Sequence, residues 1–213
     1  MNKKKGLVII GAGGHGRVCA DIALKMNKWK EIAFLDDDST IGYSMGTPII
    51  GPPREFGQYV ADYDIFVAIG NNKVRADIYT QLEHSEANIP VLIYPKAVLG
   101  EGVLIGAGTV VMAGTVVNPC TKIGKGCIIN TGSTIDHDCV IEDYVHISPG
   151  VNVAGSVSIG TFTWLGIGSV VSNNLSITSR CTVGAGAVVI ADILEPGTYV
   201  GVPARKTSFG IML

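Results

Sequence analysis

The 213-residue chain has few aromatic residues, little charge of either sign and no long apolar run. Its net charge is −2, so it lacks the basic surface that would hold a nucleic acid backbone. The one charge run, Lys3-Lys4-Lys5, is followed by too short an apolar stretch for a signal peptide or a membrane span, which favours a cytoplasmic protein. Hydrophobic residues nevertheless make up 47% of the chain, which suggests an oligomer that buries apolar surface.

The cysteines also exclude a class of proteins. There are five, an odd number in a chain without a recognisable secretory signal, which favours reduced thiols over a disulfide framework. Their spacing fits no zinc pattern, so we expect no metal site. Cys127, Cys139 and Cys181 fall on one position of the repeat described next, which favours a structural role.

An uninterrupted six-residue repeat runs from residue 98 to residue 193. It comprises sixteen hexads, each with Leu, Ile or Val second, often Gly third, and mostly a small or β-branched residue sixth. A period of six fits neither an α-helix nor a single strand and is typical of a parallel β-helix with three hexads per coil. The repeat therefore predicts about five coils, with the aliphatic residue inward, the small residue at a corner and the third residue at a turn with unusual backbone angles.

Residues 6 to about 95 follow a different pattern. Apolar strands are expected at 6–10, 32–35 and 64–69, with helical stretches after the first and third, as in a small parallel sheet. Gly11-x-Gly13-x-x-Gly16, with Asp36 about twenty positions later, fits a dinucleotide-binding fingerprint. Because only half of a doubly wound fold is present, a diphosphate carrying one nucleoside and one sugar fits better than a dinucleotide. We expect a Rossmann-like domain at 1–95 and a β-helix domain with a C-terminal tail at 96–213.

The chemistry is expected in the outward half of one hexad, at Asp136-His137-Asp138. A carboxylate beside an imidazole fixes its tautomer and stabilises the imidazolium, so a histidine in this setting can act as a general base. His137 is the candidate base, with Asp138 or Asp136 as its support and an ordinary surface histidine as the alternative. The amide of Gly155, one coil after His137, stacks beside it and is a candidate donor to a developing oxyanion. Asn118 and Asn130 lie at turn positions and are either substrate contacts or structural.

Two groups of motifs resemble one protein family. The hexads and the closing Val200-Gly201-Val202-Pro203-Ala204-Arg205 resemble the left-handed parallel β-helix of hexapeptide acyltransferases. The strand-GAGGHG-helix, FLDD and AIGNN-x-x-R segments before them resemble the PglD-type sugar N-acetyltransferases, over essentially the whole chain.

The resemblance implies a homotrimer with acetyl-CoA as co-substrate and active sites between subunits. The residues expected to bind acetyl-CoA, with Gly155 included for its position beside the base, are His146, Gly155, Ile167, Ala185 and Arg205. Those that the resemblance places at the nucleotide sugar are Gly13, Gly14, His15, Asp36, Asp37, Gly70 and Asn71.

The implied reaction is acetylation of the 4-amino group of a UDP-linked 4-amino-4,6-dideoxy sugar in bacterial glycan biosynthesis. The related alternatives are acetylation of GDP-perosamine and O-acetylation of a sialic acid. From another functional class, the chain could be a non-catalytic β-helix scaffold with a nucleotide sensor, an interpretation that the Asp-His-Asp cluster counts against.

Overall fold

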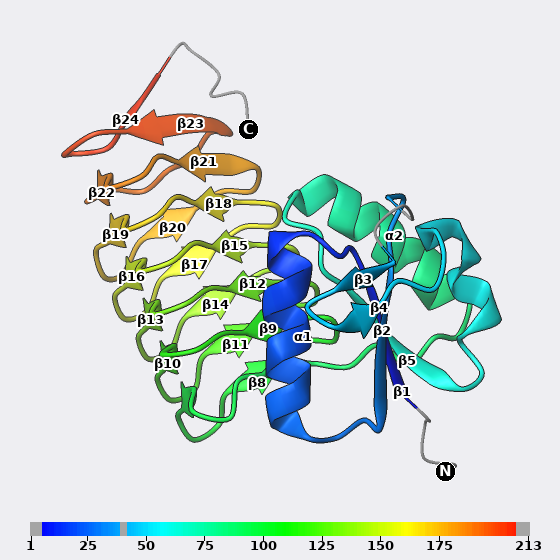
Figure 1. Ribbon diagram of the computed structural model, residues 1–213. Coiled ribbons are helices and arrows are strands. Elements are labelled where there is room, and N and C mark those ends of the chain that lie inside the picture. Colours follow the sequence, from blue (N-terminus) through cyan, green and yellow to red (C-terminus); the bar gives the residue numbers. More distant parts are fainter. Residues whose placement is uncertain (1–5, 39–41, 208–213) are drawn as a thin grey trace. The chain divides into compact units, whose positions relative to one another are not determined.

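A computed structural model describes residues 6–38 and 42–207, so the Lys3-Lys4-Lys5 run lies outside the described residues. The chain divides into two compact units, Met1–Pro95 and Lys96–Leu213 (Figure 1). In the described ranges no helix has the length and hydropathy needed to cross a membrane.

The first unit is built on a three-stranded parallel sheet with the order β2–β1–β5. The central strand β1 is buried along its whole length, as its five aliphatic or glycine residues predict. Helix α1 turns its small and aliphatic side towards the sheet, burying Gly16, Cys19 and Ile22. The alternation of strand and helix expected from the sequence is confirmed. The elements are β1 (Gly6–Ile10), α1 (Gly14–Met26), β2 (Glu31–Leu35), β3 (Tyr43–Ser44), β4 (Thr47–Pro48), the 3-10 helix η1 (Pro53–Gln58), β5 (Tyr63–Val67), α2 (Asn72–His84) and β6 (Leu92–Ile93).

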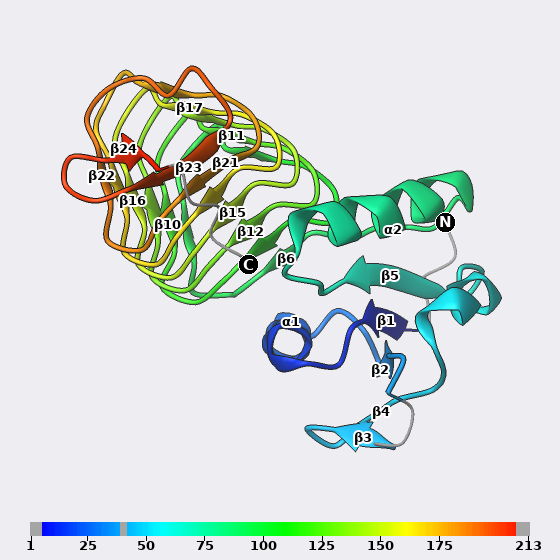
Figure 2. The same ribbon diagram turned by 90° about the horizontal axis from the view of Figure 1, so that it is seen from above.

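The second unit is a parallel β-helix, which confirms the interpretation of the repeat (Figure 1). Each hexad contributes one short strand, and each strand pairs with the one eighteen residues later, as Val116 does with Thr134. Seen from above, the successive coils lie one behind another (Figure 2). The second residue of every hexad is buried except Leu99 and Ile105, in the first coil.

The strands of the β-helix form three sheets. The first contains β7 (Val98–Leu99), β10 (Val116–Val117), β13 (Thr134–Ile135), β16 (Asn152–Val153), β19 (Val170–Val171) and β22 (Val188–Val189). The second contains β8 (Leu104–Ile105), β11 (Lys122–Ile123), β14 (Val140–Ile141), β17 (Ser158–Ile159) and β20 (Ser176–Ile177). The third includes β9 (Val110–Val111), β12 (Ile128–Ile129), β15 (His146–Ile147), β18 (Trp164–Leu165), β21 (Cys181–Val183), β23 (Gly197–Val200) and β24 (Arg205–Lys206).

The solenoid has about six turns, more than the five or so that the hexads predict. The extra length comes from residues that do not keep the repeat. Ile193 forms a bridge with Ile177, and β23, which follows Glu195-Pro196, pairs in parallel with β21. The backbone thus continues the coil beyond the last hexad, because strand pairing does not require the six-residue pattern.

The expectation about the turn residue is wrong by two positions. In the first fifteen hexads the left-handed backbone falls on the fifth residue, including Cys120, Asp138 and Tyr144, and not on the third. Glycine at the third position has another cause, which is close approach of the next coil. A Cβ on Gly106 would lie 2.6 Å from the backbone of Gly124, so no side chain fits there.

The sixth residues form a hydrogen-bonded corner. The hydroxyl of Thr121 donates to the carbonyl of Asp136 (2.7 Å) and accepts from the amide of Cys139 (3.2 Å), whose thiol lies 3.2 Å from the carbonyl of Ala154. Thr109–Cys127 and Thr163–Cys181 repeat the same amide contact. Such side chains satisfy backbone groups that the corner would otherwise bury unpaired. All five cysteines are free thiols, and Cys127, Cys139 and Cys181 are buried in these corners.

Candidate active site

His137 lies at the corner between β13 and β14 with its side chain exposed. Its Nδ1 is 2.8 Å from Oδ2 of Asp138. A carboxylate only accepts hydrogen bonds, so Nδ1 carries the proton and Nε2 is the nitrogen that can act as a base. The hydrogen bond that His137 donates to Asp138, with the charge of Asp136, raises the pKa of His137 above its usual value.

Asp136 supports the backbone of the base and not its ring. Its Oδ1 accepts from the amide of His137 (2.9 Å) and from Nδ2 of Asn118 (2.7 Å), and both bonds lower the pKa of Asp136. Of the two carboxylates, Asp138 therefore contacts the imidazole. The left-handed backbone at Asp138 is the fifth position of its hexad, so the repeat itself provides the turn that precedes the next strand.

Gly155 lies against the imidazole of His137. A Cβ at this position would be 2.7 Å from both Cε1 and Nε2 of His137, so any side chain would displace the ring. The two coils are tied at this corner by a hydrogen bond from the amide of Ser156 to the carbonyl of His137 (2.9 Å). The sequence-based expectation that Gly155 stacks on His137 agrees with this contact, while its role as an oxyanion donor stays a prediction.

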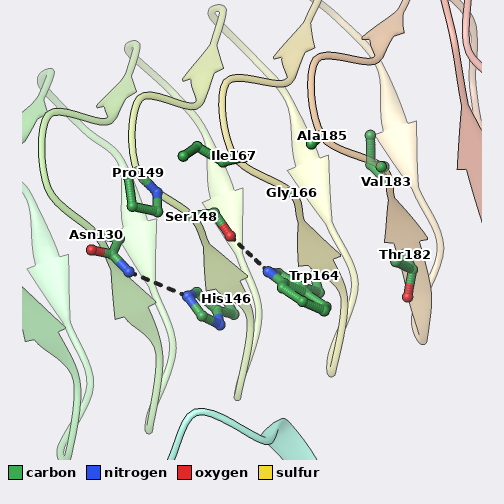
Figure 3. A pocket seen from close by; sticks show the side chains of 11 residues that line it. Asn130, His146, Ser148, Pro149, Trp164, Gly166, Ile167, Thr182, Val183 and Ala185 are labelled. Atoms are coloured by element: carbon green, nitrogen blue, oxygen red, sulfur yellow. Dashed lines mark hydrogen bonds between the residues drawn. The ribbon is translucent and has the colours of Figure 1, made fainter. Parts of the chain in front are cut away.

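A groove of about 520 Å³ lies on the third sheet (Figure 3). His146, Ile167 and Ala185, which the resemblance assigns to acetyl-CoA, line it together, whereas Gly155 and Arg205 do not. Arg205 is exposed on the antiparallel pair β23–β24, opposite Val200. The remaining lining residues are Asn130, Ser148, Pro149, Trp164, Gly166, Thr182, Val183 and Gly184.

Trp164 is a groove residue that sequence reasoning missed. It pairs with His146 across β15 and β18, and the two rings stack with centroids 5.7 Å apart at 18°. Its indole N–H donates to the hydroxyl of Ser148 (2.7 Å), while Nδ2 of Asn130 lies 3.4 Å from Nε2 of His146 (Figure 3). The signal was present, because Trp164 stands eighteen residues after His146 at the same hexad position.

A single β-helix does not bring His137 to this groove. His137 follows a strand of the first sheet, and the groove is formed on the third. Among the described residues no cluster of His, Cys, Asp and Glu side chains could hold a metal ion.

In the first unit, the glycine-rich segment joins β1 to α1. Gly11 has a φ of +102°, and a Cβ on Gly16 would lie 1.9 Å from the carbonyl oxygen of Gly11, so both positions require glycine. Gly13 and Gly14 are exposed at the start of α1, where amides and the helix dipole favour an anion.

The aspartates after β2 differ in their contacts. Asp36 accepts from the amide of Ala12 (2.6 Å) through Oδ2 and from the amide of Asp38 (3.0 Å) through Oδ1. Its carboxylate therefore holds the glycine-rich segment beside the end of β2. Asp37 is exposed next to it.

His15 and the segment after β5 complete this region. Burial, with the charge of Arg75, lowers the pKa of His15 to about 4, so its imidazole is neutral near pH 7. The side chain of Asn71 caps α2 by accepting from the amides of Lys73 (3.1 Å) and Val74 (3.0 Å), while Gly70 is exposed. Asn71 thus has a structural use that the sequence reading did not foresee.

Comparison with protein families identifies both units. Residues 6–82 match the PglD N-terminal domain, and residues 120–155 match the bacterial transferase hexapeptide repeats. The curated UDP-N-acetylbacillosamine N-acetyltransferase of Bacillus subtilis (strain 168) is 35% identical over 110 residues, which are 47% of this chain. The match spans about half, 51%, of that relative's length.

Solved structures match nearly the whole chain. The acetyltransferase domain of PglB from Neisseria gonorrhoeae FA1090, in complex with acetyl coenzyme A, is 39% identical, with a TM-score of 0.93 over 96% of this chain and 100% of that one. PerB from Caulobacter crescentus, in complex with CoA and GDP-perosamine, is 33% identical, with a TM-score of 0.90 over 95% of this chain and 97% of that one. The chain therefore belongs to the PglD-like family of hexapeptide-repeat sugar N-acetyltransferases.

Proposed function

We propose that the protein transfers acetyl from acetyl-CoA to the 4-amino group of a UDP-linked 4-amino-4,6-dideoxy sugar, in the cytoplasm, for bacterial glycan biosynthesis. The observation that carries this proposal is the geometry at His137. Asp138 occupies Nδ1, the side chain is exposed, and Nε2 lies over Gly155 with its lone pair available. The acetyl-CoA complex of the gonococcal relative supports the donor, and the name of the Bacillus relative supports the acceptor.

The reaction needs only groups that this arrangement offers. The sugar nitrogen attacks the thioester carbonyl, and Nε2 of His137 takes the proton that the nitrogen loses as the C–N bond forms. The amide of Gly155 donates to the oxyanion of the tetrahedral intermediate. The C–S bond then breaks, and CoA leaves as a thiol with the proton that the imidazolium returns. Asp138 stabilises the imidazolium between these steps.

Acetyl-CoA binds in the groove that His146, Ile167 and Ala185 line, with Arg205 near the CoA phosphates. Because His137 and this groove belong to different faces of one β-helix, the active site forms between two subunits of a homotrimer. Exposed aliphatic side chains on the outer strands, including Val98 (57%) and Leu104 (59%), supply apolar surface for such an assembly.

The first unit binds the nucleotide part of the acceptor. Gly13, Gly14 and His15 receive the diphosphate at the start of α1, and His15 does so as a neutral hydrogen-bonding group. Asp37, with Asp36 holding the segment in place, recognises the nucleoside. Gly70 and Asn71 line the same end of the sheet.

A substrate panel tests the proposal. UDP- and GDP-linked 4-amino sugars and a sialic acid are each incubated with acetyl-CoA, and free CoA thiol is followed with His137→Ala as the control. Thiol release with the UDP sugar is expected. Release with GDP-perosamine only, the acceptor bound to the Caulobacter relative, would replace UDP with GDP in the proposal. Release with the sialic acid only would make the protein an O-acetyltransferase, and no release from any acceptor would favour a scaffold.

A further inference from the structure

Arg75, the last residue of the AIGNN-x-x-R segment, has no part in the proposed reaction. It lies on α2 and is buried, with 1% of its surface exposed. Its Nη1 donates to the carbonyls of Ile69 (2.9 Å) and Gly70 (3.0 Å), and its Nη2 donates to Oδ1 of Asn72 (2.8 Å). The guanidinium thus holds the turn between β5 and α2 from within.

This turn lies beside the glycine-rich segment. β1 and β5 are neighbouring parallel strands with Ile10 opposite Val67, so the segments that follow them leave the same edge of the sheet. A Cβ on Gly11 would lie 2.9 Å from both the carbonyl oxygen of Ala68 and the side chain of Ile69, so the two segments are in direct contact.

The charge of Arg75 also reaches the start of α1. A guanidinium stays protonated at any physiological pH, and a charge in a protein interior is screened much less than one in water. His15, one residue into α1, experiences it, since Arg75 contributes to the lowered pKa of that imidazole. A diphosphate at the start of α1 would experience the same field with the favourable sign.

We propose that Arg75 is a positioning residue for the nucleotide diphosphate. Its fork shapes the turn at Ile69 and Gly70, and its buried charge favours a nucleoside diphosphate over the bare nucleoside. This inference rests on the proposed nucleotide-sugar binding by the first unit and extends it to a residue that need not touch the ligand.

Two variants separate charge from shape. Arg75→Gln removes the charge and keeps an amide donor, and Arg75→Lys keeps the charge and loses the fork. Lys73→Gln removes a charge from an exposed position of the same helix and is the matched control. The affinities of each protein for UDP and for uridine are measured by calorimetry, after a thermal melt to establish folding. GDP and guanosine replace them where the wild type prefers guanine.

The ratio of UDP to uridine affinity is the decisive quantity. It should fall about tenfold in Arg75→Gln, which corresponds to ~1.4 kcal/mol, and stay near the wild-type ratio in Arg75→Lys and Lys73→Gln. Arg75→Lys should weaken both ligands in parallel through the turn. An unchanged ratio in folded Arg75→Gln would overturn the inference.

A second measurement tests the reach of the charge without a ligand. The pKa of His15, followed by NMR, should rise in Arg75→Gln and stay unchanged in Lys73→Gln. If Arg75→Gln does not fold, an Arg75→Lys protein with a changed ligand ratio would contradict the role of charge, and a preserved ratio with weakened binding would support it. Acetyl transfer is assayed separately. UDP binding without thiol release would refute the proposed function but not the proposed role of Arg75. A wild-type protein that binds neither nucleotide would refute the role of Arg75.

Discussion

His15 and His137 are both expected to meet the same acceptor molecule, yet the two units that hold them shift the imidazole pKa in opposite directions. His137 is exposed between two carboxylates, which raise its pKa. His15 is enclosed near a buried guanidinium, and its pKa falls to about 4. His137 is thus prepared to accept a proton, whereas His15 is prepared to stay neutral. Because neighbouring residues cause both pKa shifts, each shift can be tested by single substitutions.

The units also differ in how they use polar side chains. In the first unit, Asp36, Asn71 and Arg75 bind the backbone, because loops at strand ends leave amides and carbonyls to satisfy. In the β-helix, neighbouring coils and buried corner residues such as Thr121 do this work. Outward side chains such as His137 therefore remain available for chemistry. Asp136 is an exception, because its carboxylate binds the backbone amide of His137.

The largest expected effect is that of replacing the base. His137→Ala should lower kcat by about 10²–10⁴-fold, because proton removal from the amine is lost. Since the side chain is exposed, the melting temperature should change little. The control is His84→Ala, at an exposed position of α2. A near-normal kcat in His137→Ala would refute the assignment.

Gly155→Ala should have the next largest effect, a loss of about 10²-fold in kcat, because a small displacement of a catalytic group lowers the rate by this much. The added Cβ would push the His137 ring from its place. Asn173→Ala, one coil further on and exposed, is the control. If Gly155→Ala kept its rate while a crystal structure showed a moved ring, the present position of His137 would not be the reactive one.

The acid limb of the pH–rate profile tests the pair at His137. Because the pKa of His137 is raised, kcat/KM should rise with pH through a midpoint above 6.5. Asp138→Asn should move this midpoint down and lower the plateau about tenfold, less than in a buried triad. Asp136→Asn should shift it less, since its charge is the second cause. Equal shifts would mean that Asp138 acts only through its charge.

A smaller effect, on stability, is expected from the hydrogen-bonded corner residues of the β-helix. Thr121→Val leaves the carbonyl of Asp136 and the amide of Cys139 without their partner, at a cost of about 1–3 kcal/mol in the free energy of unfolding. Ser169→Ala should be neutral or stabilising, because its buried hydroxyl has no partner within the described part of the chain. Urea denaturation measures both, and equal losses would show that the hydrogen bonds do not matter.

The smallest effect belongs to His15. Its pKa is lowered in the folded state, so acid protonates the unfolded chain first, and stability should be lost as the pH falls from 6.5 towards about 4. Carboxylates add to this loss below about pH 5, so the window from 6.5 to 5 is diagnostic. Denaturation midpoints should fall there in the wild type and less in His15→Gln. Identical slopes would contradict a neutral, half-buried imidazole.

Much of this arrangement followed from local sequence rules. The six-residue period predicted the β-helix, and its register predicted that Gly155 would stack on His137, because each coil repeats after eighteen residues. The same register would have identified Trp164 above His146. The coil beyond Pro196 was not predicted, because it depends on strand pairing and not on the six-residue pattern. The fifth-position turns and the cap at Asn71 were missed although both carried a signal, namely glycine at fifth positions such as Gly102 and Gly108 and a capping side chain before α2.

The sequence by itself determined the two architectures, the glycine positions and the histidine flanked by carboxylates, since these depend on residues near one another in the chain or at a constant spacing. Only the tertiary structure decided that Asp138, and not Asp136, contacts the imidazole, and that His137 and the groove occupy different faces of one β-helix. It also decided that Arg75 lies buried behind Gly70. These facts depend on the direction in which each side chain points. Strand pairing and packing between distant parts of the chain set that direction.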